Sequence, residues 1–431
     1  MNVLINGILV FLQLFFSSLS GVRQSDDLRL MVISDPHLMA PELLQEEGKA
    51  FNDYVSNDRK MLKESPVLLE EAVQAVLRER PQVVLIPGDL TKDGETVSHL
   101  LLRDAYLRRL REAGIQVYVV PGNHDVDNPH AVVFHGSVTR RVPTPTAAAF
   151  AELYSDYGYG KAMARDTASL SYVVQIAPKT RLLALDGCMY EENSYESNRC
   201  VTGGRLKEST LQFIKEQGRQ ARRDGQRLLA MVHHGVVQHW TWQEKIMGEY
   251  LVRDWRKVAS LLERQGVEVV FTGHFHAQDI SRRGRLYDVE TGSLVSYPSP
   301  YRSVTIHGDK MTVTSHRLTG EGLRLADGQS PADYSRSFAC EGINNTITSL
   351  LPKTMPSELR SDVCDEVCKA YIAHLDGDER MPDGETAAIE SVATRIKTYS
   401  RKLAHIFSRI CESLWTDLEP GDDTTVISLT R

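Results

Sequence analysis

Acids, histidines and one asparagine gather in five short stretches of this 431-residue chain. Carboxylate and amide oxygens, together with imidazole nitrogens, are ligands that divalent metals take in proteins. The residue types therefore predict a centre that binds divalent metal ions. The five stretches are Asp35-Pro36-His37, Gly88-Asp89, Gly122-Asn123-His124-Asp125, His233-His234 and Gly273-His274-Phe275-His276.

Two divalent ions held about 3.5–4 Å apart can activate a hydroxide at neutral pH and stabilise charge on phosphoryl oxygens. A carboxylate between the ions can bridge them, and Asp89 is the candidate for that position. Two aspartates and a hydroxide neutralise only part of the four positive charges, so an anionic substrate is still attracted. The pattern predicts the hydrolysis of a small-molecule phosphate ester.

Each of the five stretches follows an apolar, β-branched run, which is typical of a buried strand. The candidate ligands therefore fall at the carboxyl ends of strands, where open α/β sheets place their sites. The runs extend from Leu30 to Ile33, Val83 to Ile86, Val117 to Val120, Leu228 to Val232 and Val267 to Phe271.

The elements between these runs alternate between helical and extended patterns, which predicts a mixed-sheet sandwich flanked by helices. Helices are expected over residues 66–79, 97–113, 207–223 and 250–265, and further strands over residues 169–176, 181–185, 286–289, 303–307 and 311–315. An insertion over residues 38–65 lies on the side where the site opens. A lid is one interpretation of it, and a solvated acidic surface is the simpler one.

In these motifs, residues 28–317 resemble the calcineurin-like metallophosphoesterase superfamily, and most of all its cyclic-nucleotide and glycerophosphodiester branch. The resemblance implies an α/β fold, a four-layer α/β/β/α sandwich of two mixed sheets, with a helical appendage after it. It also implies two divalent ions, Mn, Fe, Zn or similar, with Asp89 between them. The implied ligands are Asp35, His37 and His276 for the first ion and Asn123, His233 and His274 for the second.

The resemblance assigns catalytic roles to the two residues that follow Asn123. His124 is expected to contact the scissile phosphate or protonate the leaving oxygen, and Asp125 to orient the His124 imidazole. Within the His233-His234 pair the first histidine is the expected ligand, and His234 is its packed or hydrogen-bonded neighbour. A phosphodiester is the favoured substrate. A phosphomonoester is the alternative, and a non-catalytic scaffold that binds through its helical region is a third interpretation.

Residues 331–418 form a second region, in which apolar residues recur at helical spacing and none of the five motifs occurs. Three helices are expected over residues 332–350, 358–374 and 385–415, followed by a strand over residues 425–429. The region could be a cap, a packing appendage or a partner-binding module.

The amino-terminal residues 1–20 have the layout of a secretory signal, with an apolar stretch before small residues. Export to a periplasmic or extracellular location is therefore expected. An uncleaved membrane anchor and a cytoplasmic location are the alternatives.

Six cysteines fit an oxidising compartment. Cys188 and Cys200 bracket a polar loop that a disulfide between them could close. Cys364 and Cys368 lie four residues apart on one predicted helix, about 5–6 Å apart at Cβ, which exceeds the reach of a disulfide. These two are expected to bond to other cysteines, for which Cys340 and Cys411 are available. Six free thiols are the alternative in the cytosol.

The net charge of −7 and the absence of a large basic cluster argue against a nucleic-acid partner. The densest basic cluster, Arg282, Arg283 and Arg285, fits a solvated hairpin. The oligomeric state is left open by the sequence.

Overall fold

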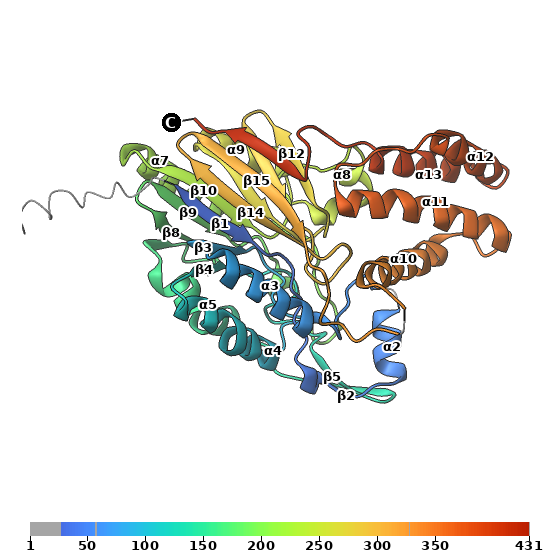
Figure 1. Ribbon diagram of the computed structural model, residues 1–431, viewed down its shortest axis with the longest axis horizontal. Helices are drawn as coiled ribbons and strands as arrows, with labels where there is room; N and C mark the ends of the chain where they lie inside the picture. The colour runs from blue at the N-terminus through green and yellow to red at the C-terminus, as the bar shows by residue number, and fades with distance from the viewer. Residues whose placement is uncertain (1–26, 57, 327, 431) are drawn as a thin grey trace, which may run out of the picture.

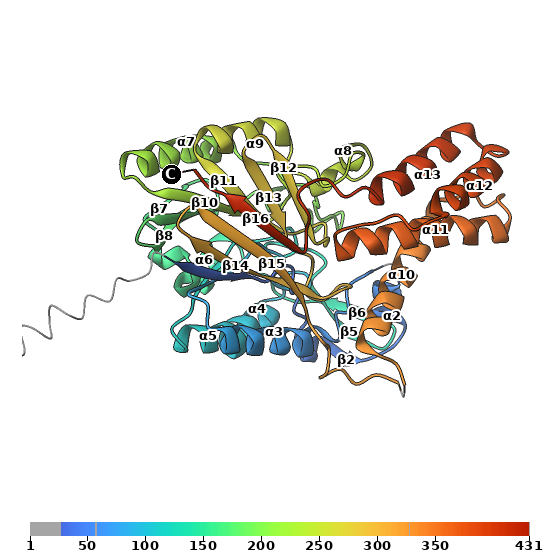
Figure 2. The same cartoon turned by 45° about the horizontal axis from the view of Figure 1, so that its top comes forward.

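The computed structural model describes residues 27–56, 58–326 and 328–430. Two large β-sheets pack face to face, and helices cover the outer face of each (Figure 1). Figure 2 shows the four layers in succession, with α3 and α5 on one side and α7 and α9 on the other. The predicted four-layer α/β/β/α sandwich of two mixed sheets is therefore confirmed.

The first sheet has six strands in the order β16-β15-β14-β1-β3-β4. β1, β3 and β4 run parallel, whereas β14, β15 and β16 pair antiparallel. The predicted strand near the end of the chain is confirmed, because β16 pairs with β15. The strands are β1 (Leu28–Val32), β3 (Val83–Ile86), β4 (Gln116–Val119), β14 (Pro300–His307), β15 (Lys310–Arg317) and β16 (Thr424–Ser428).

The second sheet has seven strands in the order β12-β13-β11-β10-β9-β8-β7. Its central strands β9, β10, β11 and β13 are parallel. Valine, leucine and isoleucine side chains from both sheets fill one shared core, and each fully buried one stabilises the fold by about 1.5–3 kcal/mol. The strands are β7 (Ala164–Arg165), β8 (Tyr172–Ala177), β9 (Thr180–Leu185), β10 (Arg227–Val232), β11 (Val267–Thr272), β12 (Asp279–Arg283) and β13 (Leu286–Glu290).

The helices that flank the sheets confirm the predictions over residues 66–79, 97–113 and 207–223. The helix predicted over residues 250–265 begins later, at Trp255, because the backbone before it is extended and Val252 N donates to Gly235 O at 2.9 Å. The helices are α3 (Ser65–Glu79), α4 (Thr96–Leu101), the π-helical η2 (Leu102–Leu107), α5 (Arg108–Glu112), α6 (Ala147–Leu153), α7 (Glu208–Arg223), α8 (Gln243–Ile246) and α9 (Trp255–Arg264). Short 3₁₀ turns are η1 (Pro41–Leu43), η3 (Ser155–Tyr157), η4 (Tyr159–Lys161), η5 (Tyr190–Glu192) and η6 (Gly248–Tyr250).

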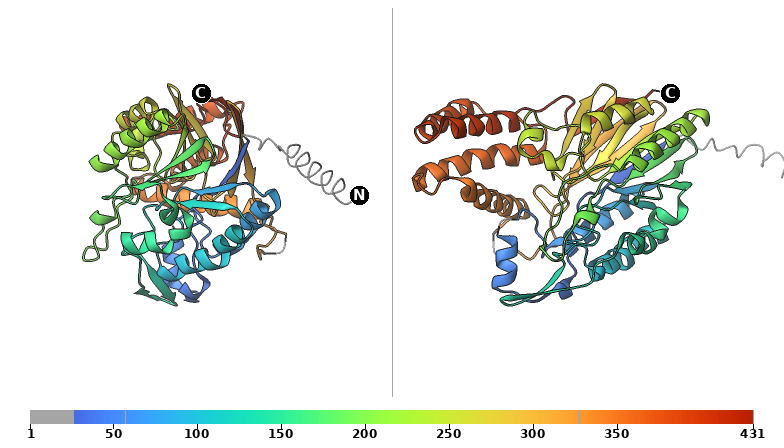
Figure 3. Two further views of the ribbon diagram at one scale, coloured as in Figure 1. Left: turned by 90° about the vertical axis from the view of Figure 1, so that its left-hand side faces the viewer. Right: turned by 180° about the vertical axis from the view of Figure 1, so that it is seen from behind.

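The described residues of the insertion, 38–56 and 58–65, are folded and share a small core with Val133 and Phe134. The insertion contributes β2 (Leu44–Glu46) to a three-stranded sheet with β5 (Val132–His135) and β6 (Val138–Arg141), and it also forms α2 (Lys49–Val55). The Phe51 and Phe134 rings meet edge to face, with centroids 5.2 Å apart. The helix α2 lies beside the carboxyl-terminal helix α10 (Figure 1 and the right-hand view of Figure 3).

Four helices lie between β15 and β16 in the sequence, and they project from one end of the sandwich (Figure 3). The expected helices over residues 332–350 and 358–374 are confirmed, but the single helix over residues 385–415 is wrong. The helix is interrupted before Ser400. The Ser400 hydroxyl accepts a hydrogen bond from Leu403 N and so caps a separate helix. The helices are α10 (Pro331–Leu350), α11 (Ser357–Asp376), α12 (Glu385–Lys397) and α13 (Arg401–Leu414).

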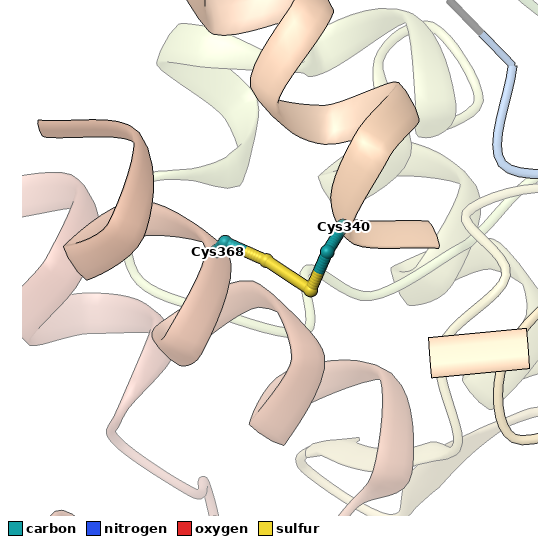
Figure 4. Close-up of a disulfide and its surroundings, with 2 residues drawn as sticks. All are labelled: Cys340 and Cys368. Carbon is teal, nitrogen blue, oxygen red and sulfur yellow. A yellow bond between two sulfur atoms is a disulfide. The ribbon is translucent and has the colours of Figure 1, made fainter. Parts of the chain in front are cut away.

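One disulfide, Cys340–Cys368, joins α10 to α11 (Figure 4). It confirms that Cys368 bonds outside its own helix. The bond expected for Cys364 is wrong, since Cys364 and Cys411 are free thiols, and the alternative of six free thiols is wrong as well.

The expected Cys188–Cys200 bond is also wrong, because the two sulfurs have separate partners. Cys188 Sγ donates to Pro121 O at 3.3 Å, whereas Cys200 Sγ donates to Asn128 Oδ1 at 2.7 Å.

The predicted signal over residues 1–20 lies outside the described residues. Within the described part of the chain, no helix has the length and apolar character needed to cross a membrane.

Candidate metal centre

The seven predicted metal ligands converge at the carboxyl edges of the two sheets, although up to 241 positions separate them in the sequence. Two groups of acids and histidines have ligand atoms within 4.8 Å of one another, and Asp89 belongs to both. The first group is Asp35, His37, Asp89 and His276, and the second is Asp89, His233 and His274.

Five of these ligands have left-handed backbone conformations, which are rare outside glycine and asparagine. Strain of this kind persists where the surrounding structure enforces it, and it concentrates at functional sites. The left-handed conformation directs each of these side chains toward the other candidate ligands. The φ angles are 48° for Asp35, 36° for His37, 47° for Asp89, 77° for His274 and 71° for His276.

Glycines before the ligands allow neighbouring loops to approach closely. A Cβ atom on Gly122 would lie 2.1 Å from Asp89 Oδ1, and one on Gly273 would lie 2.2 Å from Asp35 Oδ2. Any side chain at these two positions would push a ligand away, which explains why both motifs begin with glycine.

In the first group, three candidate ligand atoms lie close together. His37 Nε2 lies 3.3 Å from His276 Nε2, and His276 Nε2 lies 3.3 Å from Asp35 Oδ1. Burial and the Lys60 charge lower the pKa of His37, and burial lowers the pKa of His276. A neutral imidazole keeps a nitrogen lone pair that can bind a metal cation, and here two such nitrogens face each other.

The second group is built around His233. Its Nε2 lies 3.1 Å from Asn123 Oδ1 and 3.3 Å from Asp89 Oδ2, while its Nδ1 contacts Pro87 O at 2.8 Å. A proton on Nδ1, shared with that carbonyl, leaves Nε2 free to bind a metal. His274 Nε2 is buried in the same place without a hydrogen-bond partner among the described residues.

His234 has a hydrogen-bond partner outside this group. Its Nε2 contacts Thr202 O at 2.9 Å, and burial lowers its pKa to about 3. The imidazole is therefore neutral and packed, with its ring 4.3 Å from that of His274. The structure places His233 in the second group and His234 beside His274, so His233 remains the predicted ligand of the pair.

Asp89 Oδ2 is the atom that links the two groups, at 3.5 Å from His37 Nε2 and 3.3 Å from His233 Nε2. Burial alone would raise the pKa of Asp89, but His233, His124 and His37 lower it well below its usual value. An ionised carboxylate at the centre of two converging donor groups fits a pair of divalent cations.

His124 stands at the open side of the site. Its side chain is 23% exposed, whereas those of Asp35 and His37 are fully buried. Its Nε2 lies 4.0 Å from Asp89 Oδ2 and its Nδ1 lies 2.8 Å from Asp93 Oδ1. The imidazole is therefore in reach of a molecule that binds at the two groups.

The predicted contact between Asp125 and the His124 imidazole is wrong. The Asp125 carboxylate is buried and accepts hydrogen bonds from the backbone nitrogens of Gly122 at 2.8 Å and of Leu90 and Thr91 at 3.0 Å. These bonds hold together the two loops that carry Asp89 and Asn123, so Asp125 stabilises the relative position of these two residues.

Asp93 takes the orienting position instead, and sequence reasoning missed it. Its second oxygen, Oδ2, accepts from Lys92 Nζ and from Tyr54 OH, both at 2.6 Å. Lys92 also pairs with Glu95 Oε1 at 2.8 Å. The signal available in the sequence was the charged group Lys92, Asp93 and Glu95, which begins three residues after Asp89.

The sequence model described as "Calcineurin-like phosphoesterase" matches residues 28–278, more than half of the chain. No curated protein matches the chain.

Several solved structures are similar to this one at low identity. A dimetal phosphatase from Danio rerio is 18% identical, with a TM-score of 0.47 over 68% of this chain and 96% of that one. A purple acid phosphatase from yellow lupin, Lupinus luteus, is 14% identical, with a TM-score of 0.42 over 71% of this chain and 53% of that one.

Proposed function

The chain belongs to the calcineurin-like phosphoesterase family, and from this premise we propose that it hydrolyses a phosphate ester at two divalent metal ions. The observation that carries the proposal is the position of Asp89 Oδ2, within 3.5 Å of a histidine from each ligand group. Asp35, His37 and His276 would hold one ion, and Asn123, His233 and His274 the other. The ions would supply an activated hydroxide and charge stabilisation on the phosphoryl oxygens.

His124 and Asp93 would supply the proton that the leaving oxygen needs. Burial and Lys60 oppose a charge on His124, but Asp89 and the hydrogen bond to Asp93 raise its pKa. A protonated His124 can donate from Nε2 to the leaving oxygen while Asp93 holds Nδ1, which is the arrangement of a general acid.

For the ester class, we favour a phosphodiester on the resemblance of the Gly88-Asp89-Leu90-Thr91 and Gly122-Asn123-His124-Asp125 stretches to that branch of the superfamily. A phosphomonoester is the second candidate. It is favoured by the positive charge of Lys60 near His37 and His276, because a monoester carries one more negative charge than a diester.

Two measurements test the proposal. Metal analysis of the purified protein should find close to two divalent ions per chain, and their identity follows from the same measurement. Parallel assays on bis-aryl and mono-aryl phosphates should show turnover that a chelator abolishes. A protein that binds no divalent metal and cleaves neither ester would support the scaffold interpretation, in which the helical region serves only for binding.

We also propose that the protein is exported by means of residues 1–20. Mass spectrometry of the mature amino terminus, together with fractionation of the source cells, separates a cleaved signal from an uncleaved anchor and from a cytoplasmic protein.

A further inference from the structure

The insertion over residues 38–65 reaches the metal centre through a short loop, residues 58–61. Met61 N donates to Val295 O at 2.7 Å, and the next residue, Ser296, places its Oγ 3.4 Å from His276 Nδ1. Lys60 therefore sits one residue from the backbone bond that joins the insertion to the segment supporting His276.

Lys60 brings a positive charge that is only loosely paired. Its side chain is 10% exposed, and Asp58 Oδ2, at 3.5 Å, is its ion-pair partner among the described residues. The charge is close enough to oppose protonation of His37, His124 and His276. Because His37 and His276 belong to the first ligand group and His124 lies beside Asp89, the ammonium is near the place where a phosphate would bind.

The loop is held in place by its own turn and by α10. Asp58 Oδ1 accepts from the backbone nitrogens of Arg59 at 2.7 Å and Lys60 at 3.1 Å. On α10, Gly342 packs so closely that a Cβ atom there would lie 2.0 Å from Asp58 O. Nearby, Asn345 Nδ2 donates to Ser56 O at 2.6 Å.

The helix α11 holds the loop from a second direction. Arg59 Nη1 donates to Tyr371 OH at 3.2 Å, and its guanidinium carbon lies 5.5 Å from the centre of the same ring. The disulfide that joins α10 to α11 fixes the two helices relative to each other. The carboxyl-terminal helices thus form the outer support of the Lys60 loop.

We propose that Lys60 is a substrate-binding residue that contacts an oxygen of a doubly charged phosphate group, and that α10 and α11 position it. This inference rests on the proposed function of the same site. A phosphomonoester or inorganic phosphate has a third non-bridging oxygen with charge to share, whereas a diester has two non-bridging oxygens and one charge. Lys60 therefore favours binding of monoesters and phosphate over diesters.

The first test compares Lys60→Gln with Lys63→Gln, a matched control in the same insertion whose side chain is 52% exposed and pairs with Glu47. Calorimetric binding of inorganic phosphate to the metal-loaded protein should weaken about 10- to 100-fold in Lys60→Gln, the range of a charge-assisted hydrogen bond. Lys63→Gln should bind as the wild type does, and Lys60→Arg should restore most of the affinity.

Kinetics on the same variants adds a second readout. In Lys60→Gln the KM for a mono-aryl phosphate should rise by a factor similar to that for phosphate binding, and the KM for a bis-aryl phosphate should change less than about threefold. Equal losses on both esters, or unchanged phosphate binding, would overturn the role of Lys60. Calorimetry needs no turnover, so a wild type that binds metal and phosphate but cleaves nothing would instead contradict the proposed function.

The role of α11 is tested by Tyr371→Phe, which removes the hydroxyl that accepts from Arg59. Phosphate binding should weaken roughly 3- to 10-fold with the metal content unchanged, because the loop loses one hydrogen bond to a charged group. Tyr399→Phe, on the exposed turn between α12 and α13, is the control. Wild-type binding by Tyr371→Phe would show that α11 does not position Lys60.

Discussion

Asp93 Oδ1 lies 2.8 Å from His124 Nδ1, across 31 positions of sequence. The contact fixes which imidazole nitrogen faces the metal centre, since the other nitrogen, Nε2, then points toward Asp89. It also gives His124 a carboxylate that stabilises its protonated form. The orientation of the candidate general acid therefore depends on a residue outside the metal-ligand motifs.

We expect Asp93→Asn to lower kcat about 10- to 100-fold, the usual cost of losing an orienting carboxylate. Steady-state kinetics and metal analysis check this, and two metals should remain bound. Tyr54→Phe is the control, because it removes a hydrogen bond to the other Asp93 oxygen and leaves the His124 contact in place. A kcat that falls equally in both variants would point to a general loss of packing.

His124→Ala should lose turnover by about 10²- to 10⁴-fold, the range of a general acid. The metal content should stay at the wild-type value, because His124 belongs to neither ligand group. Hydrolysis rates on esters with leaving groups of different basicity check the role. A loss that does not shrink for the least basic leaving groups would argue against proton donation by His124.

The two adjacent histidines offer a matched pair. His233→Ala should lose one of the two metals, because Nε2 of His233 is directed at Asn123 and Asp89. His234→Ala should keep both metals, since its imidazole contacts Thr202 O instead. Metal stoichiometry by elemental analysis distinguishes them. Loss of a metal from His234→Ala alone would reverse the assignment.

The cysteine chemistry follows from one disulfide. Alkylation without reduction should label four thiols and alkylation after reduction six. In the chain-entropy view, a disulfide that closes a loop across a sequence separation of 28 residues stabilises the folded state by about 3–4 kcal/mol. Cys340→Ser should therefore destabilise the α10–α11 pair, measured by chemical denaturation. Cys364→Ser, which removes a free thiol on α11, should cost much less.

A buried charge network gives stability a pH dependence. His239 lies 2.8 Å from Asp279 Oδ1 and 2.5 Å from Glu290 Oε2. Burial opposes the charge on His239, but Glu290 and Asp279 raise its pKa well above 6.5, and burial raises the pKa of Glu290 to about 7. Both groups thus hold their protons more tightly in the folded chain.

With both pKa values raised, the folded state binds more protons than the unfolded state, so stability falls as pH rises. The Glu290 contribution fades between about pH 4.5 and 7, and the His239 contribution fades above 6.5 as pH passes the raised value. Urea denaturation at a series of pH values should show that the free energy of unfolding falls less with rising pH in His239→Gln than in the wild type. His135→Gln, at an exposed position, should follow the wild type.

The sequence by itself determined the fold class, and it predicted the candidate ligands that the structure brings together. Each motif is local, a strand followed at once by its polar residues, and parallel strands bring their carboxyl ends to one edge. The glycines of the Gly122-Asn123 and Gly273-His274 stretches were likewise visible in the sequence, although the structure shows which ligands they make room for. Periodicity also predicted α10 and α11 to within two residues at either end.

Only the tertiary structure decided which groups outside the motifs serve the site. The charge of Lys60, from the insertion, lowers the pKa of His37. Asp93 rather than Asp125 contacts His124, and Cys340 rather than Cys411 bonds to Cys368. Each of these contacts joins segments far apart in sequence. Their geometry depends on how loops and helices pack, which composition and spacing do not encode locally. The sequence predicted the candidate ligands, and packing supplied the Asp93 carboxylate at His124 and the Lys60 charge near the first ligand group.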